Sequence, residues 1–249
     1  MKRPFDAPHS VPVPVLLALI GLADALCRLP IAPVHGIAGA LATTAALALG
    51  VTLLLALTAR LAACPAGNRP LVACGLAAAI LAFLLRATEL PWRSVELAFD
   101  VALVTAAAAL GRLFANEVLQ LWWIVPLGLT GAMADLVSVF VPGAPTNELL
   151  ATGSPVLEYL LLVWPAFHPA PSYGFCGVSD IAIAAILYGL TVRYELPAFR
   201  SFALLAAALM MCLVLAGVAG AGLPAIPFLF FFWVAGNARP LVTSWRART

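Results

Sequence analysis

Two aspartates lie inside long apolar stretches of this chain, and their chemistry depends on whether they meet. Neither Asp135 nor Asp180 has a Lys or Arg within one helical turn on its own segment. If two such carboxyl groups share a site, one stays protonated while its neighbour is ionised. Such a pair can act as a base toward water and as an acid toward a carbonyl, which hydrolyses a peptide bond. The alternative is two independent hydrogen bonds between packed helices.

The two aspartates are expected at the same depth in a membrane. Asp135 follows Gly131-Ala132-Met133-Ala134, about two turns from the outer end of an apolar stretch at 118–141. Asp180 lies about two turns inside the outer start of the next long stretch, 172–192. Because these two spans would run in opposite directions, the sequence predicts that their carboxyl groups lie level with each other.

Small and helix-breaking residues accompany the aspartates. Gly177 has no side chain, so another backbone could approach Asp180 closely. Pro224 lacks an N–H and interrupts helical hydrogen bonding, which would leave free backbone groups near a water-filled cavity. Each residue also has a purely structural interpretation, helix packing for the glycine and a helix start for the proline.

Three segments of the chain carry a family resemblance. Asp135 in its span, the run Gly177-Val178-Ser179-Asp180, and the run Leu223-Pro224-Ala225-Ile226-Pro227 resemble, in order and spacing, the signatures of the GxGD intramembrane aspartyl proteases, the presenilins and signal peptide peptidases. The resemblance covers roughly 118–241. It implies a presenilin-like fold that cleaves membrane-embedded helices or signal-peptide remnants with water as nucleophile and no metal or organic cofactor.

The resemblance also assigns roles to residues. Asp135 and Asp180 would be the catalytic pair. The substrate-binding residues would be Gly177, Val178, Ser179, Leu223, Pro224, Ala225 and Ile226.

The composition excludes several classes of protein. Of 249 residues, 64% are hydrophobic and 10% are charged, whereas a soluble domain has about 25% charged residues. The mean hydropathy of +1.07 agrees. A net charge of +2 without a Lys/Arg cluster argues against nucleic-acid binding. The five cysteines have no metal-binding spacing and are interpreted as small apolar residues.

The apolar stretches predict an all-α polytopic membrane protein with about eight transmembrane helices, because each is close to the 20 residues that a bilayer requires. Residues 1–249 are expected to form a single integral membrane domain, with N-terminal helices in 1–117 and the catalytic helices in 118–249. An additional apolar piece, 155–167, is too short to span and is expected as a short helix at the outer membrane face. The predicted spans are 11–31, 37–59, 70–86, 95–113, 118–141, 172–192, 198–218 and 223–239.

Basic residues set the predicted orientation. With eight spans, three of the 13 Lys and Arg residues (Arg28, Arg86 and Arg93) lie on one side and the other ten on the opposite side. The positive-inside rule then places both termini in the cytoplasm. Twelve arginines against one lysine indicate a GC-rich bacterial genome and hence the bacterial inner membrane. In this orientation the resemblance is to signal peptide peptidases, and implies substrates with a cytoplasmic N-terminus.

Three alternative functions are compatible with the sequence. A proton-coupled transporter or channel could use Asp24, Asp100, Asp135 and Asp180 as a relay. A prepilin-peptidase-like enzyme also uses a GxGD aspartate, but has a basic residue soon after it. An inactive presenilin-like binding protein would fit Ala134 and Ser179, where the family usually has an aromatic residue and a glycine. The remaining intramembrane charges have structural interpretations, Asp24 paired with Arg28 and Glu96 reaching the headgroups.

Overall fold

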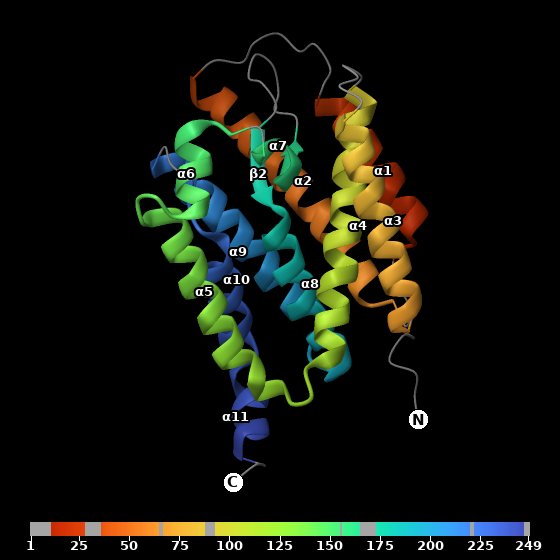
Figure 1. Cartoon of the computed structure of the whole chain (residues 1–249), viewed down its shortest axis with the longest axis vertical. Coiled ribbons are helices and arrows are strands. Elements are labelled where there is room, and N and C mark those ends of the chain that lie inside the picture. Colours follow the sequence, from red (N-terminus) through yellow and green to blue (C-terminus); the bar gives the residue numbers. More distant parts are fainter. Residues whose placement is uncertain are drawn as a thin grey trace.

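The computed structural model describes residues 11–27, 36–64, 67–87, 93–154, 156–164, 173–219 and 222–246. Within these ranges the chain is mostly helical, and long helices run along the long axis of the molecule (Figure 1). The long helices are α1 (Val13–Cys27), α2 (Gly36–Ala62), α3 (Asn68–Ala87), α4 (Arg93–Glu117), α5 (Ile124–Phe140), α8 (Val178–Arg193), α9 (Ala198–Ala219) and α10 (Ala225–Gly236). The shorter elements are η1 (Leu121–Trp123), α6 (Pro145–Thr152), α7 (Leu157–Leu160), β1 (Leu161–Trp164), β2 (Tyr173–Gly177) and α11 (Ala238–Arg246).

The lengths of the helices fit an integral membrane protein. Among the described residues, five helical segments are long and apolar enough to cross a membrane, and a sixth if α10 and α11 count as one bent span. The prediction of a mostly helical chain with several helices that could cross a membrane is confirmed. The predicted number of eight is not reached by this criterion, because α1 has 15 residues and α8 has 16.

The sixth predicted span does not begin as a helix, which corrects the all-α prediction. Its first residues form β2, which pairs with β1 in an antiparallel two-stranded sheet. Cys176 lies opposite Leu162, and a register shift follows Leu162. Helix α8 starts only at Val178, so Asp180 lies in its first turn and not two turns inside a helix.

The segment 155–167 is also only partly as predicted. Its described part begins with the single turn of α7, but continues as strand β1. A second short helix that the sequence analysis did not predict, α6, follows α5 after a turn with positive φ at Gly143. Figure 1 shows α6, α7 and the two strands together at the upper end of the molecule, next to the upper end of α5.

The last predicted span, 223–239, is helical only as far as Gly236, where α10 ends, and α11 follows at an angle of 74°. The break at Asn237 has a physical reason in Pro240, whose ring would clash with the carbonyl of Gly236 in a continuous helix. Helix α11 then runs beside η1. There the ring of Trp245 meets the edge of Trp122 with centroids 5.2 Å apart, and Trp122 stacks on Trp123.

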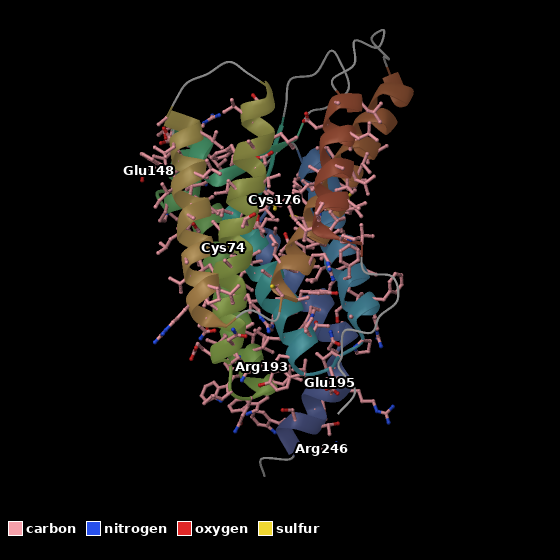
Figure 2. The ribbon with its side chains drawn as sticks, turned by 90° about the vertical axis from the view of Figure 1, so that its right-hand side faces the viewer. Cys74, Glu148, Cys176, Arg193, Glu195 and Arg246 are labelled. Carbon is pink, nitrogen blue, oxygen red and sulfur yellow. The ribbon has the colours of Figure 1, made fainter. Side chains whose placement is uncertain are left out.

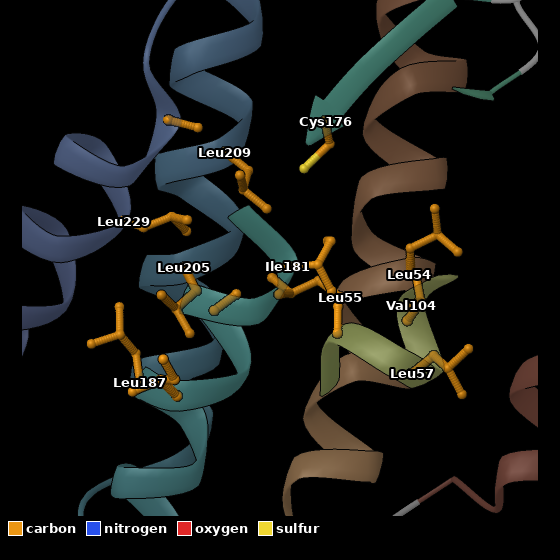
Figure 3. Close-up of a cluster of buried hydrophobic side chains, with 14 of the residues drawn as sticks. Leu54, Leu55, Leu57, Val104, Cys176, Ile181, Leu187, Leu205, Leu209 and Leu229 are labelled. Atoms are coloured by element: carbon orange, nitrogen blue, oxygen red, sulfur yellow. The ribbon is translucent and has the colours of Figure 1, made fainter. Parts of the chain in front are cut away.

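The core lies where α8 meets α2, α4, α9 and α10. Figure 3 shows this cluster, in which Leu55 of α2, Leu205 of α9 and Leu229 of α10 surround α8. Helix α4 lies close to α8 at Gly111, where an added Cβ would lie 2.5 Å from the carbonyl oxygen of Ala182. Small residues therefore set the distance between these two helices, as is common in membrane proteins.

Candidate active site

Asp180 is the third residue of α8 and closes the start of that helix. Its Oδ2 accepts a hydrogen bond of 2.9 Å from the backbone N–H of Gly177, the residue that precedes the helix. This is the carboxylate half of a capping box, which satisfies a donor at the helix N-terminus. The side chain of Asp180 is therefore oriented by the backbone N–H of Gly177.

Space beside Gly177 is short. Its backbone is extended, with φ −76° and ψ 152°, so any residue could adopt it. A Cβ at this position would lie 3.2 Å from Asp180 Oδ2 and 3.3 Å from Ser179 Oγ. A side chain would thus press on the carboxylate that the glycine N–H binds.

Asp135 holds the start of another helix in the same way. Its Oδ2 accepts a hydrogen bond of 3.0 Å from the backbone N–H of Ile226, the second residue of α10. Pro224 precedes α10 with extended backbone and offers no side chain to cap it. The carboxylate of α5 thus supplies the acceptor that the N-terminus of α10 lacks.

Glycines on α5 allow α10 to come this close. A Cβ on Gly128 would lie 2.1 Å from the ring of Phe230, and a Cβ on Gly131 would lie 3.9 Å from Ile226. Gly128, Gly131 and Asp135 are spaced by three and four residues, so they share the face of α5 that meets α10. The spacing of these small residues was visible in the sequence, but its partner helix was not.

Asp135 and Asp180 are 45 positions apart in the sequence, but helices α5 and α8 bring their carboxyl groups near each other. Asp135 interacts electrostatically with Asp180, and both interact with Cys212 of α9. Each carboxylate uses Oδ2 for its backbone partner. The Oδ1 atoms have no hydrogen-bond partner among the described residues, so one oxygen of each acid remains for a water molecule or a substrate carbonyl.

Two cysteines that the sequence analysis treated as neutral apolar residues belong to this site. The Sγ of Cys176 lies 3.7 Å from Asp180 Oδ2. The Sγ of Cys212 lies 3.7 Å from the carbonyl oxygen of Leu223, at the entry to α10. Figure 3 shows Cys176 at the end of β2, with its sulfur directed toward the apolar cluster. No spacing rule predicted this, because the two residues come from a strand and a distant helix.

The remaining predicted residues surround the two acids to different degrees. Ser179 is exposed and Val178 is partly buried, whereas Pro224 and Ala225 are buried against the bundle. Leu223 and Ile226 take part through their backbone, as described above.

The other intramembrane acids divide into two groups. Asp100 of α4 is 1% exposed and interacts electrostatically with Cys176, so it belongs to the surroundings of Asp180. Asp24 is buried in α1. Its predicted partner Arg28 lies outside the described residues, and Glu96 lies in the first turn of α4.

Helix α10 is fixed at its other end by buried polar contacts. The indole N–H of Trp233 donates to the hydroxyl of Thr191 in α8 at 2.9 Å. The side-chain amide of Asn237 donates to Ser201 of α9 at 3.2 Å and to the carbonyl of Trp233 at 2.9 Å. These contacts hold the helix whose N-terminus binds Asp135 in place against α8 and α9.

Comparisons of the chain with protein-family models, with curated proteins and with solved structures found no match. In the part of the chain that the structure describes, no three His, Cys, Asp or Glu side chains are grouped so that they could hold a metal ion.

Proposed function

We propose that this protein is an intramembrane aspartyl protease in which Asp135 and Asp180 act together on a water molecule. The observation that carries the proposal is the pair of Oδ1 oxygens, which lack partners among the described residues while both Oδ2 atoms are held by backbone N–H groups. An acid pair held in this way is oriented before the substrate arrives, which is what general acid–base catalysis requires.

The proposed reaction is a water addition followed by bond cleavage. The ionised carboxylate takes a proton from water while the water oxygen attacks the peptide carbonyl carbon. The protonated partner donates its proton to the carbonyl oxygen. The resulting gem-diol collapses when one of its hydroxyl protons passes to the carboxylate that is now ionised and the other carboxyl group protonates the leaving nitrogen. The C–N bond then breaks and yields a new carboxyl group and a new amine. Residues 177–179 and 223–226 would contact the substrate backbone.

A helical substrate has to unwind before water can reach its carbonyl carbon. Strand β2 ends at Gly177, three residues before Asp180, and its only strand partner among the described residues is β1. Its other edge is therefore suited to pair with an unwound substrate strand beside the acids. Because all this lies among apolar helices, the substrate class we propose is a membrane-embedded helix or a signal-peptide remnant.

The proposed topology places the arginine-rich end in the cytoplasm of a bacterial inner membrane. Arg193 and Arg246 lie at the lower end of the molecule and Glu148 at the upper end (Figure 2), and the positive-inside rule assigns the basic end to the cytoplasm. Single cysteines at positions 195 and 245 should react with an impermeant reagent only from the cytoplasm, and a cysteine at 145 only from outside. Labelling of position 145 from the cytoplasm would reverse the assignment.

The deciding experiment uses purified protein in liposomes with fluorescently labelled single helices of both polarities. We expect cleavage of the helix whose N-terminus is cytoplasmic, and none by Asp135→Asn or Asp180→Asn, because Asn keeps the backbone hydrogen bond but cannot exchange the proton. Cleavage by either variant at the wild-type rate would refute the catalytic assignment. A preference for the opposite polarity would refute the orientation alone.

A second candidate function rests on the buried carboxyl group of Asp100. Together with Cys176 and Asp180 it could form part of a proton path in a transporter or channel. The same liposomes distinguish the two functions, because a transporter would acidify or alkalinise the lumen in a pH gradient and would leave the labelled helices intact.

A further inference from the structure

Helices α2, α4 and α8 meet at a second polar cluster, at the end of α8 that is remote from Asp180. Ala62, Ala108 and Ala185 are buried against one another there, and Tyr188 packs on them. One turn further along α4 lies Arg112. Arg60 lies in the last turn of α2, and Arg193 is the last residue of α8. We call Arg60, Arg112, Arg193 and Tyr188 the arginine cluster.

Two of these arginines already bind the ends of neighbouring helices. Arg112 donates from Nη1 to the carbonyl oxygen of Gly189 in α8 at 3.2 Å. Arg193 donates from Nη1 to the carbonyl oxygen of Ala115 in α4 at 2.8 Å, and also to that of Asn116. Each guanidinium group thus binds carbonyls in the last turns of the other's helix, where the helix dipole favours a cation.

These contacts leave other donors of the cluster without acceptors. The Nε atoms of Arg60 and Arg112 are buried and have no hydrogen-bond partner among the residues that the structure describes. Within the described ranges, no carboxylate forms an ion pair with any of the three arginines. The groups that act electrostatically on Arg112 are Arg193 and the thiol of Cys64, and Arg60 acts on Tyr188.

An uncompensated group of cations in a packed junction is costly. A buried donor on a charged group without an acceptor costs about 1–3 kcal/mol or more, and like charges add repulsion. A single anion with several oxygen acceptors would remove both costs, because it can accept from two guanidinium groups at once. A phosphate group has this geometry, and guanidinium groups match it better than ammonium groups do.

The position of the cluster indicates where the phosphate comes from. Helices α2 and α4 both pass the length and hydropathy criteria for a membrane span, and the cluster lies near the end of each. Lipid headgroups are found at this level, and basic pockets between transmembrane helices on the cytoplasmic side bind anionic lipids. Arg60, Arg112 and Tyr188 are each partly exposed, so a ligand can reach them.

We propose that Arg60, Arg112 and Arg193 bind the phosphate of an anionic phospholipid at the junction of α2, α4 and α8, with the Tyr188 hydroxyl as a further donor. The lipid would hold α8, which carries Asp180, together with α2 and α4, the two helices packed against it. The proposal does not depend on the proposed protease activity.

Native mass spectrometry of the detergent-purified protein tests the proposal by counting retained phosphatidylglycerol and phosphatidylcholine. We expect one phosphatidylglycerol to bind about tenfold more tightly than phosphatidylcholine, the factor that corresponds to about 1.4 kcal/mol. Arg60→Gln should abolish this preference. It is the main variant because Arg60 has no hydrogen bond to the described part of the protein, so its replacement leaves the helix contacts of Arg112 and Arg193 intact.

Arg69→Gln is the matched control, since Arg69 is an exposed arginine in the first turn of α3. An equal loss of lipid in both variants would show attraction by net charge alone and overturn the proposal, as would an absence of headgroup preference in the wild type. Inorganic phosphate is titrated separately, with thermal stability as the readout. Stabilisation by phosphate that needs Arg60, without any lipid preference, would overturn the assignment to a lipid.

Discussion

The two aspartates stand on helices with very different surroundings. Helix α8 packs against α2, α4, α9 and α10, and eight of its 16 residues are buried. Helix α5 packs mainly against α10, and only Ile124 and Ala132 of its 17 residues are buried. On its outer faces α5 exposes large apolar side chains such as Met133, Val137 and Phe140. One acid therefore belongs to the core and the other to the periphery.

This difference indicates that one helix of the site is fixed and the other can move. A helix held on several sides keeps Asp180 and the end of β2 in a constant position. A helix with one major contact can tilt at little cost in buried area, and its apolar outer faces are compatible with lipid or with a substrate helix. For the proposed protease we therefore expect that substrate enters along α5, whereas α8 keeps Asp180 in a constant position.

The largest expected effect concerns activity, where the two helices should behave alike. Asp135→Asn and Asp180→Asn should each reduce the rate of helix cleavage by at least about a thousandfold, within the range that general acid–base catalysis provides. The double variant should be no slower than either single variant, because the pair acts as one unit. Rates are measured in the liposome assay. Multiplicative losses in the double variant would mean that the carboxyl groups act independently.

The next effect concerns packing at two glycines with different surroundings. Gly111→Ala places a methyl group 2.5 Å from the Ala182 carbonyl at the interface of α4 with α8, so we expect it to lower the free energy of unfolding by about 3 kcal/mol. On α5, the Cβ of Gly131→Ala would lie 3.9 Å from Ile226, which is an ordinary contact, so the free energy of unfolding should change by less than about 1 kcal/mol. Unfolding in a denaturing detergent titration measures both. Equal losses would contradict the difference in packing between the two positions.

A smaller effect is expected where α8 holds α10. Thr191→Val keeps the shape of the side chain but removes the acceptor of the Trp233 indole N–H, which is fully buried. The unpaired donor should cost about 2 kcal/mol of folding free energy. Thr243→Val is the control, because that hydroxyl is exposed and bonds only within its own helix. A similar loss in both variants would remove the buried contact as an explanation.

The smallest effect concerns the accessibility of the surroundings of Asp135 and of Asp180 to a reagent. A cysteine introduced as Met133→Cys on α5, close to Asp135, should react with a membrane-permeant maleimide about tenfold faster than buried Cys176 beside Asp180. Cys74 provides an internal reference because it is exposed. Mass spectrometry of the labelled peptides gives the rates. Equal labelling of residues 133 and 176 would show that both sides are equally open.

The sequence was informative where a single span carries its own signal. Long apolar stretches predicted α2, α3, α4 and α9 closely, and the isolated acids predicted which carboxyl groups to examine. The motifs around Gly177 and Pro224 were identified, but what they do was not. The catalytic role and the presenilin-like architecture stay predictions, since they depend on reactivity and relatedness that the geometry does not measure.

The differences arose where partners distant in sequence decide the outcome. The residues of β2 read as the start of an apolar span, and only pairing with β1 makes them a strand. The helix break near Asn237 was not predicted, because Pro240 lies just beyond the predicted span of 223–239. Cys176 and Cys212 have no motif, so their place beside the acids emerges only from tertiary structure.

The tryptophan contacts at the arginine-rich end give α5 a pivot. Trp122 and Trp123 precede the helix, and Trp122 meets Trp245 of α11, so this end is anchored. Asp135 lies 12 residues further along, about 18 Å away at 1.5 Å per residue. A tilt of about 5° around the pivot would displace the carboxyl group by about 1.5 Å, about half the length of a hydrogen bond. In the proposed mechanism the helix would act as a lever arm, by which a slight push from an arriving substrate changes the gap between the two carboxyl groups.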